Sequence, residues 1–344
     1  IGGTTTGTYA ISNNTVTGNH GYAGIFAIAQ GTATPTFQID SNISSSNLHI
    51  GEPTYAVPPG TSSTDSGRGI RVDFDTNTQG DVRISGNTVQ NNGWAGMYVY
   101  GFNNSIINVC EMKNNISSGN SSIDISLVGN DASSVSNVII SGNTIDRNST
   151  RGMQLALNYG STGSIYNAIV TDNTVTNCGD SGISVKPYGT GSITITLARN
   201  TFTGNTYGVN FHLKNSSSVT AIVYDNVISG QTFEGIELGS QNTSHLTASF
   251  YNNTIANNGW GVIVGKPGYN QLLTDVDFGG GTQGSIGHNS IYGNTSYDMK
   301  NITSGPTIAE YNWWGTATPA PTQFIETPPL GTIDHTNQLS SDPN

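Results

Sequence analysis

The feature that most constrains this fold is a short phrase centred on Asn-Thr, which recurs along most of the chain. Its clearest copies are Ser-Gly-Asn-Thr-Val at 85–89, Ser-Gly-Asn-Thr-Ile at 141–145, Thr-Asp-Asn-Thr-Val at 171–175, Ala-Arg-Asn-Thr-Phe at 198–202 and Tyr-Asn-Asn-Thr-Ile at 251–255, with looser copies at Asn14, Asn42, Asn115, Asn226 and Asn289. Successive copies from Asn87 to Asn253 are 26 to 30 residues apart. A nearly constant period indicates one structural coil per copy and predicts about ten coils.

Each copy carries the same order of local patterns. An Asn-rich turn is followed by Gly and by alternating apolar and polar residues, as at 96–100 and 182–186, and a second alternating stretch such as 138–140 leads to the next Asn. Alternation with a period of two is typical of strands, and several short strands per coil indicate a β-solenoid. Because one coil cannot bury its own apolar face, the coils must stack. We therefore predict an all-β parallel solenoid with a period near 27 residues.

The composition excludes several classes of function. The chain has 11 Lys and Arg, 22 Asp and Glu, and a formal net charge of −11. Residues that favour helices are scarce, which argues against an α-rich or doubly wound fold. So few cations leave no basic stripe for nucleic acid. No apolar run approaches the roughly 18 residues that cross a bilayer. We expect neither a nucleic-acid partner nor membrane insertion.

Two cysteines, Cys110 and Cys178, lack any metal-ligand spacing, and we expect both to be buried thiols. Because the chain begins within a repeat, we also expect that a further segment precedes Ile1 in the complete protein. The polar, lysine-poor composition favours an extracellular or cell-surface location. The expected state is a monomer or part of a larger surface protein.

The repeat from about residue 8 to 315 resembles that of the right-handed parallel β-helices of the pectin-lyase-like superfamily, in particular its NosD-like and cell-surface branches. The segments 277–281, 284–289 and 312–315 are similar to the closing coils of bacterial and archaeal cell-surface β-helices. The resemblance implies a β-helix over 1–315, with insertions near 44–67 and 265–285, and an extended tail at 316–344 that packs on or leaves the last coil. It leaves the chemistry open, because the superfamily includes lyases, hydrolases, epimerases, adhesins and tailspikes.

Three regular features receive structural interpretations. The Asn column suits left-handed bends and hydrogen bonds from coil to coil. The Gly that opens each main strand suits unusual backbone angles. Trp313 and Trp314 suit the sealing of the last coil. We predict that all three belong to the scaffold.

The alternation of the main strands sorts their residues into inward and outward sets. Taking Ile70, Met97, Ile123, Met153, Ile183, Val209 and Ile236 as inward predicts that charged and aromatic residues gather on one outer face. We predict substrate binding at this face by Arg71, Tyr98, Tyr100, Arg151, Gln154, Asn210, Lys214 and Glu237. A face of this kind suits an extended polysaccharide, and the insertion near 44–67 would wall one end of it.

Two catalytic hypotheses follow from the predicted face. Asp73 and Asp124, two coils apart, would lie roughly 10 Å from each other, near the upper limit for the acid and base of an inverting glycoside hydrolase. Alternatively, Lys186 or His212, on neighbouring coils, would remove the proton α to a uronate carboxylate while Arg151 or Lys214 neutralises the developing charge. The spacing does not decide between them.

Neither mechanism requires a cofactor, but the sequence leaves a bound calcium ion as an alternative. Asp73, Asp75, Asn77 and Asp81 place oxygen ligands on alternate residues near Gly80, which resembles a calcium loop without its closing Glu.

The sequence thus predicts an extracellular polysaccharide-active protein that cleaves glycosidic bonds as a hydrolase or lyase. The alternative is a non-catalytic adhesin or envelope β-helix that binds glycans.

Overall fold

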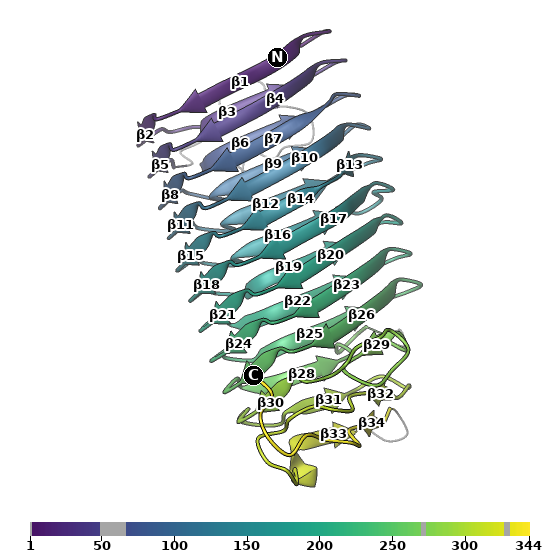
Figure 1. Cartoon of the computed structure of the whole chain (residues 1–344). Helices are drawn as coiled ribbons and strands as arrows, with labels where there is room; N and C mark the ends of the chain where they lie inside the picture. The colour runs from purple at the N-terminus through teal and green to yellow at the C-terminus, as the bar shows by residue number, and fades with distance from the viewer. Residues whose placement is uncertain (1, 49–66, 270–272, 327–330) are drawn as a thin grey trace.

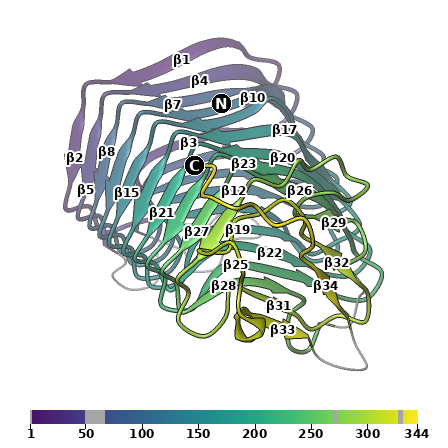
Figure 2. The same cartoon turned by 60° about the horizontal axis from the view of Figure 1, so that its bottom comes forward.

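The chain winds into a solenoid whose wall consists of three parallel β-sheets. The computed structural model describes residues 2–48, 67–269, 273–326 and 331–344. Each strand pairs with the strands at the same place in the coils before and after it, so the coils stack along one axis (Figure 1). The first and the last strands lie at opposite ends of this axis. The view in Figure 2 shows the three sheets surrounding one interior.

The three sheets account for the described strands. The first sheet contains β1 (Thr6–Ser12), β4 (Thr34–Asp40), β7 (Gln79–Ser85), β10 (Ile106–Lys113), β13 (Ser134–Val135), β14 (Val138–Ser141), β17 (Ser164–Thr171), β20 (Ser192–Ala198), β23 (Ser218–Tyr224), β26 (His245–Tyr251), β29 (Val276–Asp277), β32 (Thr307–Ile308) and β34 (Ile333–Asp334). The second contains β2 (Thr15–Thr17), β5 (Ile43–Ser45), β8 (Thr88–Gln90), β11 (Ile116–Ser118), β15 (Thr144–Asp146), β18 (Thr174–Thr176), β21 (Thr201–Thr203), β24 (Val227–Ser229), β27 (Thr254–Ala256) and β30 (Ser290–Tyr292). The third contains β3 (Ala23–Ala29), β6 (Arg68–Phe74), β9 (Met97–Gly101), β12 (Ile125–Gly129), β16 (Met153–Leu157), β19 (Ser181–Pro187), β22 (Tyr207–Leu213), β25 (Glu234–Ser240), β28 (Trp260–Val264), β31 (Met299–Asn301) and β33 (Phe324–Glu326).

Inward-facing apolar side chains form one cluster along the solenoid. In the third sheet, Met97, Ile125, Met153 and Ile183 follow one another in register and are fully buried. The third sheet has 11 strands, so the solenoid has about eleven turns rather than the ten predicted. Equivalent residues of neighbouring coils recur at 28 residues in several turns. The predicted all-β parallel solenoid is confirmed.

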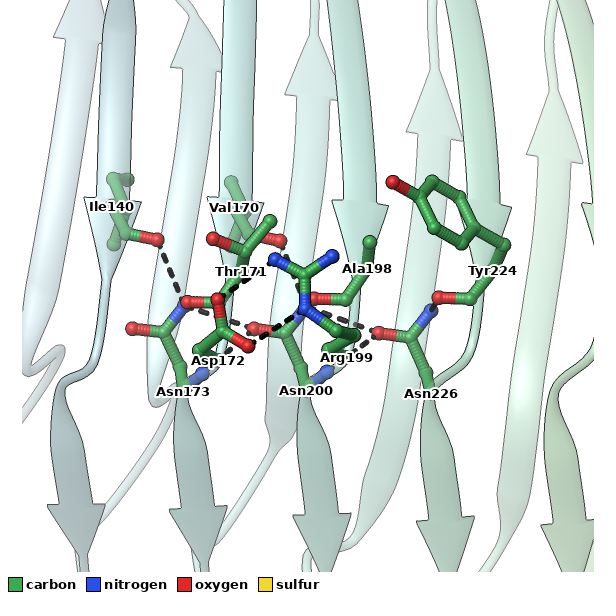
Figure 3. Close-up of polar contacts among 10 residues, drawn as sticks. All are labelled: Ile140, Val170, Thr171, Asp172, Asn173, Ala198, Arg199, Asn200, Tyr224 and Asn226. Atoms are coloured by element: carbon green, nitrogen blue, oxygen red, sulfur yellow. Dashed lines mark hydrogen bonds and ion pairs between the residues drawn. The ribbon is translucent and has the colours of Figure 1, made fainter.

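The Asn column is a continuous hydrogen-bonded ladder inside the bend between the first and second sheets (Figure 3). The Asn173 amide Nδ2 and backbone N–H both donate to Oδ1 of Asn200, at 2.9 and 3.1 Å, and Asn200 repeats both bonds to Asn226 at 3.0 Å. The expected left-handed conformation belongs instead to the residue before each Asn, such as Asp172 at φ 59° and Arg199 at φ 53°. The ladder therefore supplies the buried backbone of every bend with partners.

The last part of the chain continues the solenoid. β33 pairs with β31 and β34 pairs with β32, so the described parts of the tail, 316–326 and 331–344, add strands to two sheets and pack on the last coils. A short 3₁₀ helix, η2 (Pro321–Gln323), precedes β33. Trp314 is fully buried and meets the ring of Phe324 edge-on at 4.8 Å. Among the described residues, no helix is long and apolar enough to span a membrane.

The two predicted insertions have different outcomes. Most of the one near 44–67 lies outside the described residues. The one near 265–285 contributes β29 to the first sheet and a loop organised by Asp277. The buried carboxylate of Asp277 accepts hydrogen bonds from the backbone N–H groups of Gly279, Gly281, Gln283 and Ser285 at 2.8 to 3.1 Å.

Candidate functional site

The outward side of the third sheet, called here the third-sheet face, collects most of the predicted site residues. Its register sets Arg71 beside Tyr98, Asp73 beside Tyr100, and Asn210 beside Glu237. Val185 pairs with Phe211, so the residues that follow them, Lys186 and His212, lie on neighbouring coils. These columns agree with the predicted alternation on every strand except β12.

Asp124 is the exception, and its predicted place on the outer face, after an inward Ile123, is wrong. Ile125, not Ile123, pairs with Met97, which brings Ser126 beside Tyr98. Asp124 instead occupies the corner place that Gly96 and Gly152 fill in neighbouring coils. There it is fully buried and accepts hydrogen bonds from Ser117 Oγ at 2.7 Å and Asn120 Nδ2 at 2.5 Å. Asp124 therefore does not reach the face or form a catalytic pair with Asp73.

The same corner explains the Gly column better than backbone angles do. None of the strand-opening glycines Gly69, Gly96, Gly152, Gly182, Gly208, Gly235 and Gly261 has a positive φ. A Cβ at Gly152 would collide with Val175 and with the carbonyl of Gly182. These glycines permit close approach of the second and third sheets rather than a left-handed turn.

At the N-terminal end of the face, Arg71 and Asp73 form a buried ion pair of 2.7 Å. The Arg71 guanidinium lies over the rings of Tyr22, Tyr98 and Tyr100, at 4.4, 5.2 and 5.7 Å from their centroids. Burial raises the pKa of Asp73, against the lowering effect of Arg71. With its carboxylate held by Arg71 and enclosed, Asp73 is poorly placed to activate water.

Five coils after the Arg71–Asp73 pair, His212, Glu237 and Lys266 form a connected group, called here the charged centre. His212 Nε2 lies 2.6 Å from Glu237 Oε2, and Lys266 Nζ donates to both oxygens of Glu237 at 2.7 and 2.9 Å. His212 and Glu237 are 7% and 4% exposed, so solvent screens these contacts weakly.

The protonation of the charged centre follows from its contacts. Burial raises the pKa of Glu237, but hydrogen bonds and charge from His212 and Lys266 outweigh it and lower that pKa overall. Burial lowers the pKa of His212 overall, despite Glu237. Because an ionised carboxylate only accepts hydrogen bonds, a neutral His212 must carry its proton on Nε2. Nδ1 is then the basic atom of the ring.

A hollow of about 290 Å³ adjoins the charged centre and is lined by Arg151, Gln154, Ala156, Leu157, Asn158, Lys186 and Tyr188. Arg151 Nη2 is 3.0 Å from Asp180 Oδ2 on one side and Arg151 Nη1 is 3.5 Å from Gln154 Oε1 on the other. Burial lowers the pKa of Lys186 to about 8. The hollow thus presents a guanidinium and an amine that can gain or lose a proton near neutral pH.

Three tyrosines, called here the tyrosine wall, surround Lys214 beside this hollow. Its ammonium lies 5.9, 5.0 and 5.5 Å from the ring centroids of Tyr159, Tyr188 and Tyr269, and Nζ donates to Tyr159 Oη at 3.3 Å. Tyr159 is 64% exposed. Asn210, also predicted for binding, is buried and donates to Ser181 Oγ at 2.8 Å.

The structure therefore divides the predicted site. It brings together Arg151, Gln154, Lys186, Asn210, His212, Lys214 and Glu237, and leaves Arg71, Asp73, Tyr98 and Tyr100 in a separate cluster. Lys266 and the tyrosine wall escaped prediction because they lie in turns after the strands, where alternation gives no direction. Their position along the sequence could have identified some of them, since Tyr159, Tyr188 and Lys266 each follow a main strand by one or two residues.

The four calcium candidates do not form a metal site in the described structure. Asp73 pairs with Arg71 on β6, whereas Asp81 belongs to β7 in another sheet and lies 3.4 Å from Arg83. Asp75 accepts from Asn103 Nδ2 at 2.8 Å, and Asn77 takes a left-handed turn conformation. Within the described ranges, no group of three or more His, Cys, Asp or Glu side chains could hold a metal ion.

Comparisons with known proteins give the family. Residues 161–320 match a family described as "Protein of unknown function (DUF1565)". No curated protein matches the chain. A solved structure, the Azotobacter vinelandii Mannuronan C-5 epimerase AlgE6 A-module, is 12% identical with a TM-score of 0.41, over 100% of this chain and 92% of that chain. Residues 1–223, more than half of the sequence, match the family described as "Right handed beta helix region", and the chain therefore belongs to the right-handed β-helix family.

Proposed function

We propose that this protein binds an acidic polysaccharide on the third-sheet face and cleaves it by β-elimination. The observation that carries the proposal is the charged centre beside the hollow of Arg151 and Lys186. Four of the chain's 11 Lys and Arg residues, Arg151, Lys186, Lys214 and Lys266, lie in this region of an otherwise acidic protein. Such a concentration of cations favours a carboxylate-bearing sugar.

In the proposed reaction, Arg151 binds the uronate carboxylate and Nδ1 of His212 removes the proton on the adjacent carbon, C5. The electron pair forms the C4=C5 double bond, and the glycosidic C4–O bond breaks. Lys186, protonated at neutral pH, gives a proton to the departing oxygen. Glu237 keeps the proton of His212 on Nε2, and Lys266 keeps Glu237 ionised. Only side chains of this chain take part.

Elimination is favoured over hydrolysis because the predicted carboxylate pair is not available. Inverting hydrolysis needs two carboxyl groups facing the same bond across a water molecule. Asp124 points into the corner and Asp73 is enclosed by Arg71 and tyrosines. The base and the acid of elimination, by contrast, come from adjacent coils.

Non-catalytic glycan binding is the second candidate, as in an adhesin or an envelope protein. It is favoured by the ion pairs of Arg151 with Asp180 and of Lys266 with Glu237, which hold both cations in fixed positions for binding. Either function acts on polymers found outside cells, which supports an extracellular or cell-surface location.

The test is a panel of uronate polymers, measured for ultraviolet absorbance of unsaturated ends and for binding. We expect the wild type to release unsaturated products and His212→Gln and Lys186→Met to lose them while still binding. Asp124→Asn is the matched control and should stay active. Binding without products in the wild type would favour the second candidate. Full activity in His212→Gln would overturn the proposed mechanism.

A further inference from the structure

A second feature of the third-sheet face lies outside the charged centre. The rings of Tyr207, Phe233, Trp260 and Tyr297, called here the aromatic row, follow one another along the solenoid axis. Their successive centroids are 5.6, 5.6 and 5.9 Å apart. Tyr207 and Trp260 open β22 and β28, while Phe233 and Tyr297 precede β25 and β31 within two residues. The row therefore follows the upstream edge of the sheet.

The aromatic row is open to solvent at its middle. Phe233 is 41% exposed, which is unusual for a phenylalanine between two other rings. Lys300 Nζ lies 5.5 Å from the ring centroid of Tyr297 at the far end. An exposed ring flanked by half-buried ones offers apolar surface that the C–H groups of a sugar can cover.

One oxygen of the Glu234 carboxyl group, beside the aromatic row, lacks a hydrogen-bond partner within the described part of the chain. Glu234 pairs in register with Trp260 and is only 4% exposed. Its Oε2 atom has no hydrogen-bond partner among the described residues. A buried polar atom left this way costs free energy, and an incoming group that supplies the missing bond recovers it.

The environment of Glu234 selects a hydroxyl group rather than an anion. Burial raises the pKa of Glu234 to about 7, with the charge of Glu237 acting in the same direction. Near neutral pH much of this carboxyl group is protonated, so it can both donate to and accept from sugar hydroxyls. An ionised uronate carboxylate only accepts hydrogen bonds, so it could use the donor of the protonated Glu234 but not its acceptor.

We propose that the aromatic row and Glu234 form a second sugar subsite, which binds a neutral pyranose. The pyranose covers Phe233 and Trp260, and one of its hydroxyls pairs with Glu234 Oε2. The inference rests on the proposed function in one respect, because it takes the neutral sugar to belong to the same polymer as the uronate that binds at the charged centre. The substrate class is then a polysaccharide that contains both neutral and acidic sugars.

The experiment measures ligand-observed saturation-transfer NMR with methyl β-glucoside, methyl β-galactoside and methyl α-mannoside. In the wild type we expect transfer to at least one glycoside. Phe233→Ala and Glu234→Met should reduce it about fivefold, as expected for one aromatic contact or one hydrogen bond. Tyr159→Ala, in the tyrosine wall, is the matched control and should leave it unchanged. Because Phe233 is exposed, its variant should fold even if a Trp260 variant does not.

The outcomes separate this subsite from the proposed function. No transfer to any of the three glycosides, or equal loss in Phe233→Ala and Tyr159→Ala, overturns the subsite even if uronate polymers are cleaved. Transfer that depends on Phe233 while no uronate polymer is bound or cleaved supports the subsite and overturns the proposed function. Lys186→Met should lose cleavage and keep the neutral-sugar signal, because it lies outside the aromatic row.

Discussion

Ser117 donates a hydrogen bond of 2.7 Å to Asp124 at a corner where the neighbouring coils have an apolar residue and a glycine. Ser117 occupies the middle of β11, the place that Val89 and Ile145 take in β8 and β15. Asp124 takes the place of Gly96 and Gly152. The two substitutions belong together, because the small hydroxyl makes room and supplies a partner for the carboxyl group.

Restoring the usual pair should stabilise the protein. Neighbouring coils already combine a glycine with valine or isoleucine at this corner, so Asp124→Gly with Ser117→Val requires no new packing. Replacing a buried polar pair by apolar packing should raise the free energy of unfolding at pH 7 by about 1–3 kcal/mol. Denaturant unfolding of the wild type and the double variant measures this difference in free energy. Asp124→Gly alone should gain less, because it leaves the Ser117 hydroxyl without its acceptor, and a double variant weaker than the wild type would contradict the prediction.

Replacing Asp124 should also change how the free energy of unfolding depends on pH. Burial raises the pKa of Asp124 from 3.8 to about 6, opposed by hydrogen bonds from Asn120 and Ser117. The folded protein therefore holds this proton more tightly than the unfolded chain. The stabilisation that this proton gives the folded protein is complete below pH 3.8 and is lost as the pH rises to about 6.

The loss should amount to about 3 kcal/mol at most. The measurement is the free energy of unfolding of the wild type minus that of Asp124→Asn, between pH 4 and 7. Because Glu234 and other carboxyl groups are common to both proteins, their titration cancels. A difference that does not change over this range would show that Asp124 has an ordinary pKa.

The Asn ladder and the ion pair beside it should differ sharply in their effect on stability (Figure 3). Asn200 is 1% exposed, accepts two hydrogen bonds from Asn173, and donates to Val170 O and Ala198 O. Asn200→Ala leaves several of these groups without partners and should cost about 2–4 kcal/mol. Arg199 forms hydrogen bonds of 2.9 Å with Asp172, but both side chains are half exposed.

Arg199→Ala is the matched control for Asn200→Ala, because the two residues are adjacent. An exposed ion pair contributes about 0–1 kcal/mol. Thermal or denaturant unfolding of the two variants checks the contrast. Similar losses in both would mean that the ladder owes its stability to the outer pair rather than to the buried amides.

The repeat predicts the fold because the same residue types recur wherever the same backbone position recurs. Alternation also predicts the face of Lys186, His212 and Glu237, since each lies inside a regular strand. It fails at Asp124, where a polar residue at a corner interrupts the Gly column and shifts the apparent register by two residues. Lys266 and Tyr269 lie after β28 in a turn, where direction depends on contacts that no local pattern records.

Lys266 should control the pH dependence of elimination through Glu237 and His212. The charge of Lys266 lowers the pKa of His212, and its hydrogen bonds lower the pKa of Glu237. Lys266→Met removes both effects, so the pKa of His212 should rise. Because His212 acts as a neutral base, activity appears as the pH rises through this pKa, and the acidic limb of the activity profile should move to higher pH.

Lys300→Met, on the same face but beside Tyr297, is the matched control and should leave the limb in place. An unmoved limb in Lys266→Met would remove His212 from the role of base. The charge of Lys266 also lowers the pKa of Lys186, but Lys186 acts as the acid, so its titration sets the basic limb of the profile instead.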